Sequence, residues 1–167
     1  MKINLAENIH VYPILASTTV TSSTATYTNF VKTKCVGQGM LELELSFGTC
    51  SATDSTGDYT ITVVESSAGI STDTSYALPF MYRSSTAVGS DNLAAATTAS
   101  TTGYAVLATA IDNTVQLLYV DMADVTREYV GALVTPSADS TSYIITGAVA
   151  RFVPRYGQAS AIACSTT

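Results

Sequence analysis

Apolar and polar residues alternate along much of the chain with the period of two that is typical of β-strands. The clearest case is residues 40–47, where apolar positions alternate with Glu42, Glu44 and Ser46. Successive side chains of a strand point to opposite faces, so this pattern predicts a strand with one buried and one solvated face. Weaker alternation predicts further strands at residues 10–16, 25–32, 59–63, 75–83, 103–111, 115–121, 129–135 and 142–153.

Short polar segments rich in turn-forming residues separate the predicted strands. Residues 53–58 predict a hairpin-type loop around a glycine, and Asp112-Asn113 predicts a two-residue turn between two strands. Residues 90–102 are rich in Ala, Ser and Thr, and a loop is favoured there over a short helix at residues 92–96. About nine strands with such connectors predict an all-β fold, namely a two-sheet antiparallel sandwich that is jelly-roll-like.

The length of 167 residues is typical of one domain. Strand patterning is weak at both ends of the sequence. We therefore predict an N-terminal arm at residues 1–12, a β-sandwich domain at residues 13–156 and a C-terminal tail at residues 157–167. Segments of this kind often become ordered on a neighbouring subunit.

The composition indicates a domain whose surface is partly covered by other proteins. Hydrophobic residues make up 47% of the chain and charged residues only 12%, against about 25% in typical proteins. Ser and Thr, which occupy 46 positions, supply the missing polarity. A surface with so few charges is poorly suited to a freely soluble monomer, so the composition favours a partner or a homo-oligomer.

Charge and hydropathy also exclude several classes of partner. The net charge is −6 and the seven basic residues are scattered, whereas binding to nucleic acid requires clustered Lys and Arg. A membrane span requires about 18 consecutive apolar residues, and the sequence has no such run. Polar residues interrupt the first ten positions, which do not resemble a secretory signal, so we expect synthesis in a reducing cytoplasm.

The three cysteines, Cys35, Cys50 and Cys164, are too few and too widely spaced for a disulfide framework or a zinc site. We interpret them mainly as small buried apolar residues, with Cys164 exposed in the tail. A bridge between Cys35 and Cys50 remains a minor alternative.

The sequence has few residues that could form a catalytic site, and we predict no catalytic residues, no metal site and no cofactor. His10 is the only histidine, and an edge-strand or arm position explains it better than a nucleophilic site. Two loose carboxylate groups could hold Ca²⁺ or act as acid and base, but they do not match a calcium loop and are common in turns. These groups are Asp54 with Asp58, and Asp121 with Asp124 and Glu128.

Two segments are the candidate contact sites of the chain. Arg side chains are enriched at protein interfaces, because the planar guanidinium pairs with carboxylates and carbonyls. The alternative for the basic segment is a solvated strand end. The candidate residues for contact with a partner or another subunit are His10, Val11 and Tyr12 in the arm, and Arg151, Arg155 and Tyr156 near the C-terminus.

The C-terminal third also resembles a known class of proteins. The segments that carry the resemblance are VQLLYVDMAD at residues 115–124, REYVGALVTP at residues 127–136 and IITGAVARFVPRY at residues 144–156. In this pattern a strand that ends in Asp is followed by a Tyr-Val strand and then by a long strand that ends near Pro-Arg-Tyr. It is similar to the C-terminal half of small virion proteins of tailed bacteriophages.

The resemblance implies a capsid decoration, or cement, protein. Such proteins are non-enzymatic β-sandwiches that bind the outside of the shell, often as homotrimers, and bridge neighbouring major capsid subunits. The implied partner is therefore the major capsid protein, and the implied location is the outer capsid surface of the virion. Three alternatives remain open: a phage tail or head-fibre component, a carbohydrate-binding sandwich and, least favoured, a small hydrolase.

Overall fold

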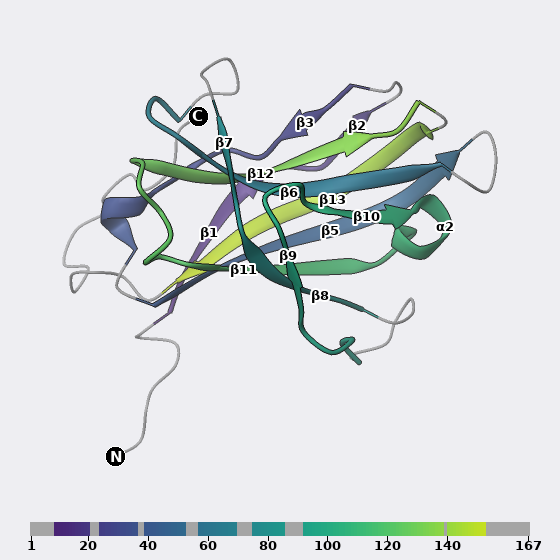
Figure 1. Ribbon diagram of the computed structural model, residues 1–167. Coiled ribbons are helices and arrows are strands. Elements are labelled where there is room, and N and C mark those ends of the chain that lie inside the picture. Colours follow the sequence, from purple (N-terminus) through teal and green to yellow (C-terminus); the bar gives the residue numbers. More distant parts are fainter. Residues whose placement is uncertain are drawn as a thin grey trace.

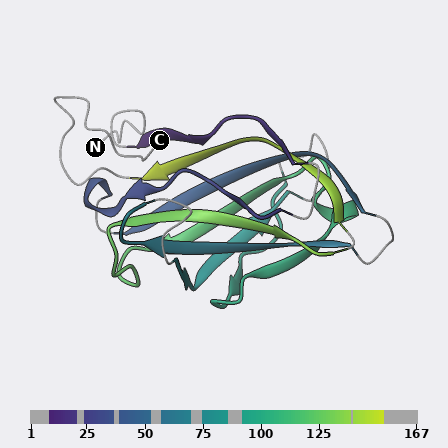
Figure 2. The ribbon, with the colours of Figure 1, turned by 90° about the horizontal axis from the view of Figure 1, so that it is seen from above.

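The computed structural model describes residues 9–20, 24–36, 39–52, 57–69, 75–85, 92–138 and 140–152. Within these residues, two antiparallel sheets pack face to face (Figures 1 and 2). Strands that follow one another in sequence mostly alternate between the two sheets. The prediction of an all-β, two-sheet antiparallel sandwich is confirmed.

The larger sheet has seven strands in the order β1-β13-β5-β11-β8-β9, with β2 paired to β13. Its first and last strands in sequence are neighbours in space, and the long β5 and β13 form its centre. The strands are β1 (His10–Leu15), β2 (Thr18–Val20), β5 (Met40–Ala52), β8 (Phe80–Ser84), β9 (Thr97–Ala99), β11 (Val115–Asp121) and β13 (Ser140–Phe152).

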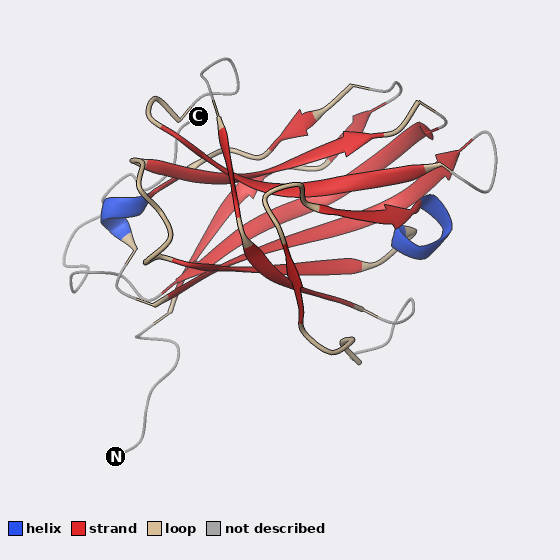
Figure 3. Ribbon diagram, in the orientation of Figure 1, coloured by secondary structure: helices blue, strands red, loops and turns tan. Residues whose placement is uncertain are grey.

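The smaller sheet has six strands, with the order β10-β6-β12-β3, and β4 and β7 pair with β12 and β6. These strands are β3 (Thr26–Tyr27), β4 (Val31–Lys32), β6 (Asp58–Ser66), β7 (Tyr76–Leu78), β10 (Tyr104–Leu107) and β12 (Tyr129–Pro136). Two short helices, η1 (Thr33–Cys35) and α2 (Ala108–Ile111), lie toward opposite ends of the sandwich (Figure 3).

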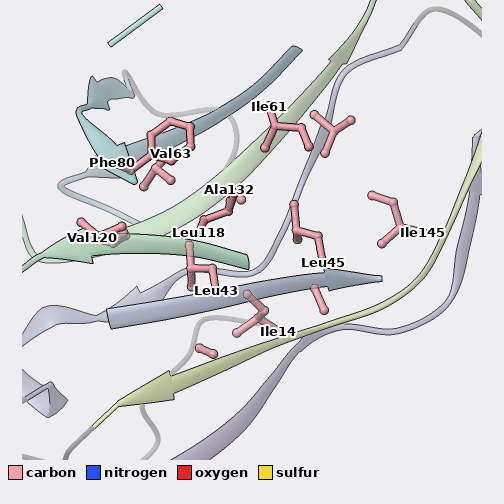
Figure 4. Close-up of a cluster of buried hydrophobic side chains, with 14 of the residues drawn as sticks. Ile14, Leu43, Leu45, Ile61, Val63, Phe80, Leu118, Val120, Ala132 and Ile145 are labelled. Carbon is pink, nitrogen blue, oxygen red and sulfur yellow. The ribbon is translucent and has the colours of Figure 1, made fainter. Parts of the chain in front are cut away.

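The hydrophobic core fills the space between the sheets. The leucines of β5 and the apolar residues of β11 meet those of β6 and β12 from the opposite sheet (Figure 4). Each fully buried side chain of this size contributes about 1.5–3 kcal/mol to folding. The core residues that Figure 4 labels are Ile14, Leu43, Leu45, Ile61, Val63, Phe80, Leu118, Val120, Ala132 and Ile145.

Buried polar groups in this core have hydrogen-bond partners. The carbonyl oxygens of Ser51 and Ser142 lie 2.9 and 2.8 Å from the Tyr59 hydroxyl and share its single proton. The hydroxyl of Tyr143, whose ring packs edge-on against Tyr59, lies 2.6 Å from Thr26 Oγ1. Burying a hydroxyl without a partner costs free energy, so these bonds allow two tyrosines to fill the core.

Two predicted strands are interrupted in the structure. The segment predicted at residues 75–83 forms β7 in one sheet and β8 in the other, divided at Pro79, which has no N–H to donate to a ladder. The segment predicted at residues 25–32 forms only β3 and β4. Between them the Thr28 hydroxyl accepts a hydrogen bond from the Ala132 N–H.

The Ala- and Thr-rich segment predicted as a loop contains a strand. Residues 97–99 form β9, which pairs with β8 at the edge of the seven-stranded sheet. The chain then turns at Gly103 and enters the six-stranded sheet as β10. Gly103 has φ of +78°, and an added Cβ would lie 2.5 Å from the Ile61 carbonyl oxygen, so the crossing requires glycine.

The strand predicted at residues 103–111 also ends early. Its second half is the helix α2, and the turn at Asp112-Asn113 therefore joins a helix to β11 rather than two strands. The Asp112 carboxylate accepts a hydrogen bond from the Cys50 N–H, and Asn113 has φ of 52°, a conformation that Asn tolerates. Both residues were expected in a turn, but the helix before them was not.

The cysteines differ from the expected picture. Cys35 is disulfide-bonded, whereas the buried Cys50 is a free thiol, so the two are not bridged to each other. The remaining cysteine of the sequence, Cys164, lies outside the described residues. Burial of Cys50, with a smaller effect of the Asp112 charge, raises its pKa to about 11, which leaves the thiol protonated and unreactive at neutral pH.

Candidate interaction surface

The side of the seven-stranded sheet that faces away from the core carries two rows of cross-strand neighbours. The alternation of buried and partly exposed residues identifies the outward positions, and the strand register aligns them. One row is Val11, Arg151, Glu42, Tyr119 and Met81, and the next is Pro13, Val149, Glu44, Leu117 and Arg83. We call the surface that these ten residues form the outer face.

Several large apolar side chains are exposed to solvent on or next to the outer face. Six large apolar side chains are well exposed in the described part of the chain, and Val11 and Met81 are two of them, at 55% and 41%. A third, Met40, lies next to the outer face at the start of β5 and is 42% exposed. Exposed apolar side chains that gather on one surface, with polar groups among them, are typical of protein interaction sites.

A small ion cluster lies in the middle of this surface. Arg151 Nη1 is 2.7 Å from Glu42 Oε1 and also forms an ion pair with Glu44 Oε2. Partial burial alone lowers the pKa of Arg151, but the hydrogen bonds and charges of the two glutamates outweigh it and raise the pKa. One guanidinium therefore serves two carboxylates, and the cluster has a net charge of −1.

An open hollow of about 210 Å³ lies beside the ion cluster, between β1, β5 and β13. Pro13, Leu15 and Val149 contribute apolar walls, Gly147 leaves space because it has no side chain, and Glu44 provides the acidic rim. The hollow is smaller than the roughly 300–1,000 Å³ of sites that hold small-molecule ligands. Its size suits a single side chain of another protein.

The structure brings together two of the segments predicted as contact sites. Val11 lies directly opposite Arg151 on neighbouring strands, and His10 lies opposite Phe152. Tyr12 is half-buried and packs against the core rather than pointing outward. Residues 10–12 are thus part of a strand of the sandwich, which begins before residue 13.

The remaining predicted contact residues, Arg155 and Tyr156, lie outside the described residues, as do residues 1–8 of the predicted arm and the tail at 157–167. The guanidinium of Arg151 forms ion pairs with Glu42 and Glu44 of the same chain. No local sequence pattern indicates this pairing, because it arises from the register of β13 on β5.

Sequence reasoning missed a second charged cluster, at the end of the six-stranded sheet. The Glu65 side chain, on the core side of β6, accepts hydrogen bonds from the N–H groups of Thr126 and Arg127 and from the Thr126 hydroxyl, at 2.8–3.0 Å. The Arg127 guanidinium lies 3.8 Å above the Tyr76 ring. The sequence does contain one sign of this cluster. Glu65 occupies the same face of the strand as Tyr59 and Ile61, which places a carboxylate at a position where an apolar residue is expected.

The two carboxylate groups considered as calcium sites lie in different parts of the fold. Asp58 is in β6, whereas Asp121 ends β11 and caps the turn that follows it through the Ala123 N–H. Asp54 lies outside the described residues. Among the residues that the structure describes, no group of three or more His, Cys, Asp or Glu side chains is arranged to hold a metal ion.

Comparisons with known protein families and with curated proteins do not indicate a function. No family model matches the chain, and no curated protein matches it either. In the described part of the chain, no helix combines the length and the apolar character needed to cross a membrane.

Proposed function

We propose that this chain is a non-enzymatic virion protein that decorates a tailed-phage capsid and cements it by binding across neighbouring major capsid subunits. The observation that carries the proposal is the outer face, where exposed apolar side chains surround a central ion cluster on one side of a β-sandwich. The resemblance of the C-terminal third to small virion proteins names the capsid as the partner.

The physical demands of this role fit the surface. A decoration protein gains affinity by repeating modest contacts with several shell subunits, so each contact need not be strong. A homotrimer would repeat every contact three times at a three-fold position of the shell. Low charge over the whole chain is compatible with a surface that is covered after assembly.

The geometry of the chain ends supports a role for the flanking segments. The described chain begins next to its own end, because His10 pairs with Phe152 across β1 and β13. The sequence before Ile9 and the sequence after Phe152 therefore continue from neighbouring points. We propose that residues 1–8, together with Arg155 and Tyr156, add contacts to the shell.

Binding to shells and the copy number per particle test the proposal together. The purified chain is mixed with empty shells assembled from the major capsid protein of the phage that encodes it, and co-sedimentation is measured. We expect saturable binding and hundreds of copies on each native virion. A handful of copies would instead indicate a tail or head-fibre part, and absence from the particle would overturn the proposal.

A further inference from the structure

The ion cluster on the outer face has an unbalanced negative charge and lies beside an apolar hollow. Glu42 and Glu44 share the guanidinium of Arg151, which leaves one carboxylate charge uncompensated. The other arginine of the outer face, Arg83, donates hydrogen bonds to the carbonyl oxygens of Ala94 and Leu93. Its position at the far side of the sheet, on β8, leaves the β5 carboxylates as the dominant charge beside the hollow.

We propose that the outer face binds a segment of the partner protein that carries a large apolar side chain next to a lysine or arginine. The apolar side chain enters the hollow between Pro13, Leu15 and Val149, and the cation approaches Glu44. This inference rests on the proposed function only for the identity of the partner, the major capsid protein. It adds which surface is used and what chemistry the shell must present.

The size of the hollow and the charge at its rim select this occupant. A volume of about 210 Å³ accommodates one large side chain, and its walls offer apolar contacts to that side chain. Lysine and arginine carry apolar stems, so a cation can lie along an apolar surface and still place its charge at a carboxylate. Complementary charge also fixes the register in which a segment binds.

A second copy of the chain fits the outer face less well. Two copies that met with their hollows opposed would bring together two ion clusters that each have a net charge of −1, and each chain has a net charge of −6. Like charges placed opposite each other reduce affinity. A basic segment of a different protein meets no such penalty.

Three variants separate the roles of the hollow and the charge. Gly147→Val fills the hollow, and its Cβ has ample room, because the nearest heavy atom, the Leu15 carbonyl oxygen, is 3.9 Å away. Glu44→Gln removes the excess charge but keeps the pair of Arg151 with Glu42. Arg151→Gln raises the excess from one negative charge to two.

Matched controls make the same chemical changes away from the outer face. Thr135→Val places the same side chain at an exposed position on the six-stranded sheet, and Glu128→Gln removes one exposed carboxylate elsewhere. Circular dichroism and thermal unfolding of all five variants verify that each is folded. Sedimentation of the free proteins shows whether any variant changes the oligomeric state.

The experiment measures the affinity of each folded variant for the empty shells at several salt concentrations. We expect Gly147→Val to weaken binding about tenfold or more, as for a central interface contact. Glu44→Gln should weaken it about threefold and flatten the salt dependence, and Arg151→Gln should strengthen it, because attraction to a cation grows with the excess charge. The two controls should bind like the wild type.

Each contrary result has a distinct meaning. If the wild type binds but Gly147→Val and Glu44→Gln bind equally well, the outer face is not the docking surface, although the proposed function stands. If Arg151→Gln weakens binding, the partner is not cationic, and the inference fails. If Gly147→Val changes the oligomeric state of the free chain, a second copy occupies the hollow. If the wild type itself does not bind shells, the proposed function fails.

Discussion

Two carboxylate–arginine clusters in the described part of the sandwich have arginines of similar exposure, 31% and 34%, but carboxylates in opposite surroundings. Glu65 is 5% exposed, and its oxygens are occupied by backbone N–H groups and a hydroxyl. Glu42 and Glu44 have side chains that are 25% and 22% exposed and share one arginine on the outer face. We call these the buried cluster and the surface cluster.

The difference shows which cluster maintains the fold and which is free to act on a partner. The buried cluster holds the connector at residues 122–128 to β6, because the Glu65 carboxylate accepts hydrogen bonds from the backbone N–H groups of Thr126 and Arg127. Without Glu65 these N–H groups would have no acceptor. Among the described residues, the surface cluster accepts no hydrogen bond from a backbone N–H group, and it keeps an unbalanced charge. Its loss should therefore affect binding more than stability.

The largest expected effect is from Glu65→Ala. The substitution leaves two partly buried N–H groups without acceptors and Arg127 without its counter-charge, and we expect it to lower the free energy of unfolding by about 3 kcal/mol. Urea unfolding measures the change. The matched Glu44→Ala variant should lose less than about 1 kcal/mol. Equal losses for the two variants would contradict the distinction between the clusters.

Substitution of the two arginines should also destabilise the protein more at the buried cluster than at the surface cluster, but with a smaller difference in unfolding free energy. Arg127→Met leaves the Glu65 charge buried without a cation and removes the stacking on Tyr76, which we expect to cost about 2 kcal/mol. Arg151→Met should cost less than about 1 kcal/mol, because its partners remain solvated. Thermal and urea unfolding provide the comparison, and a larger cost for Arg151→Met would reverse the assignment.

Salt should separate the clusters further. Surface ion pairs are screened by added salt, whereas buried pairs are screened much less. The small difference in unfolding free energy between the wild type and Arg151→Met should therefore shrink at about 1 M NaCl. The difference between the wild type and Arg127→Met should persist, and its disappearance would show that the buried cluster is accessible to solvent.

The smallest effect concerns the titration of Tyr119 beside the surface cluster. Burial, and then the Glu42 charge, raise the pKa of Tyr119, whereas Arg83 opposes the shift. Glu42→Gln should lower this pKa and Arg83→Gln should raise it further, as measured by NMR of the labelled tyrosine ring. Because the folded-state pKa is raised, the associated stability is present below pH of about 10 and is lost as the pH rises through the folded-state pKa. A pKa that does not respond to Glu42→Gln would mean that the cluster charge does not reach Tyr119.

Local patterning predicted the strands well where one face is apolar and the other polar. The leucines of β5 alternate with glutamates, and the strand is present with its leucines buried. The helix α2 and the strand β9 were missed because short Ala- and Thr-rich segments have no clear period, and contacts with neighbouring strands decide their conformation.

The surface site could be predicted only in part. Val11 and Arg151 were selected from their own segments, and the structure makes them neighbours. Their proximity to Glu44 and to the hollow depends on the pairing of β1, β13 and β5, which lie far apart in the sequence. A local sequence pattern does not specify the register between distant strands. The ion cluster could therefore be recognised only once the fold was known.

An image reconstruction of the native virion at a resolution that traces the chain tests the central claim most directly. The account predicts density for this sandwich on the outside of the capsid, repeated with the symmetry of the shell, with the outer face against major capsid subunits and a basic residue of the shell close to Glu44. Density confined to the tail or to a fibre, or an outer face that points into solvent, would contradict it.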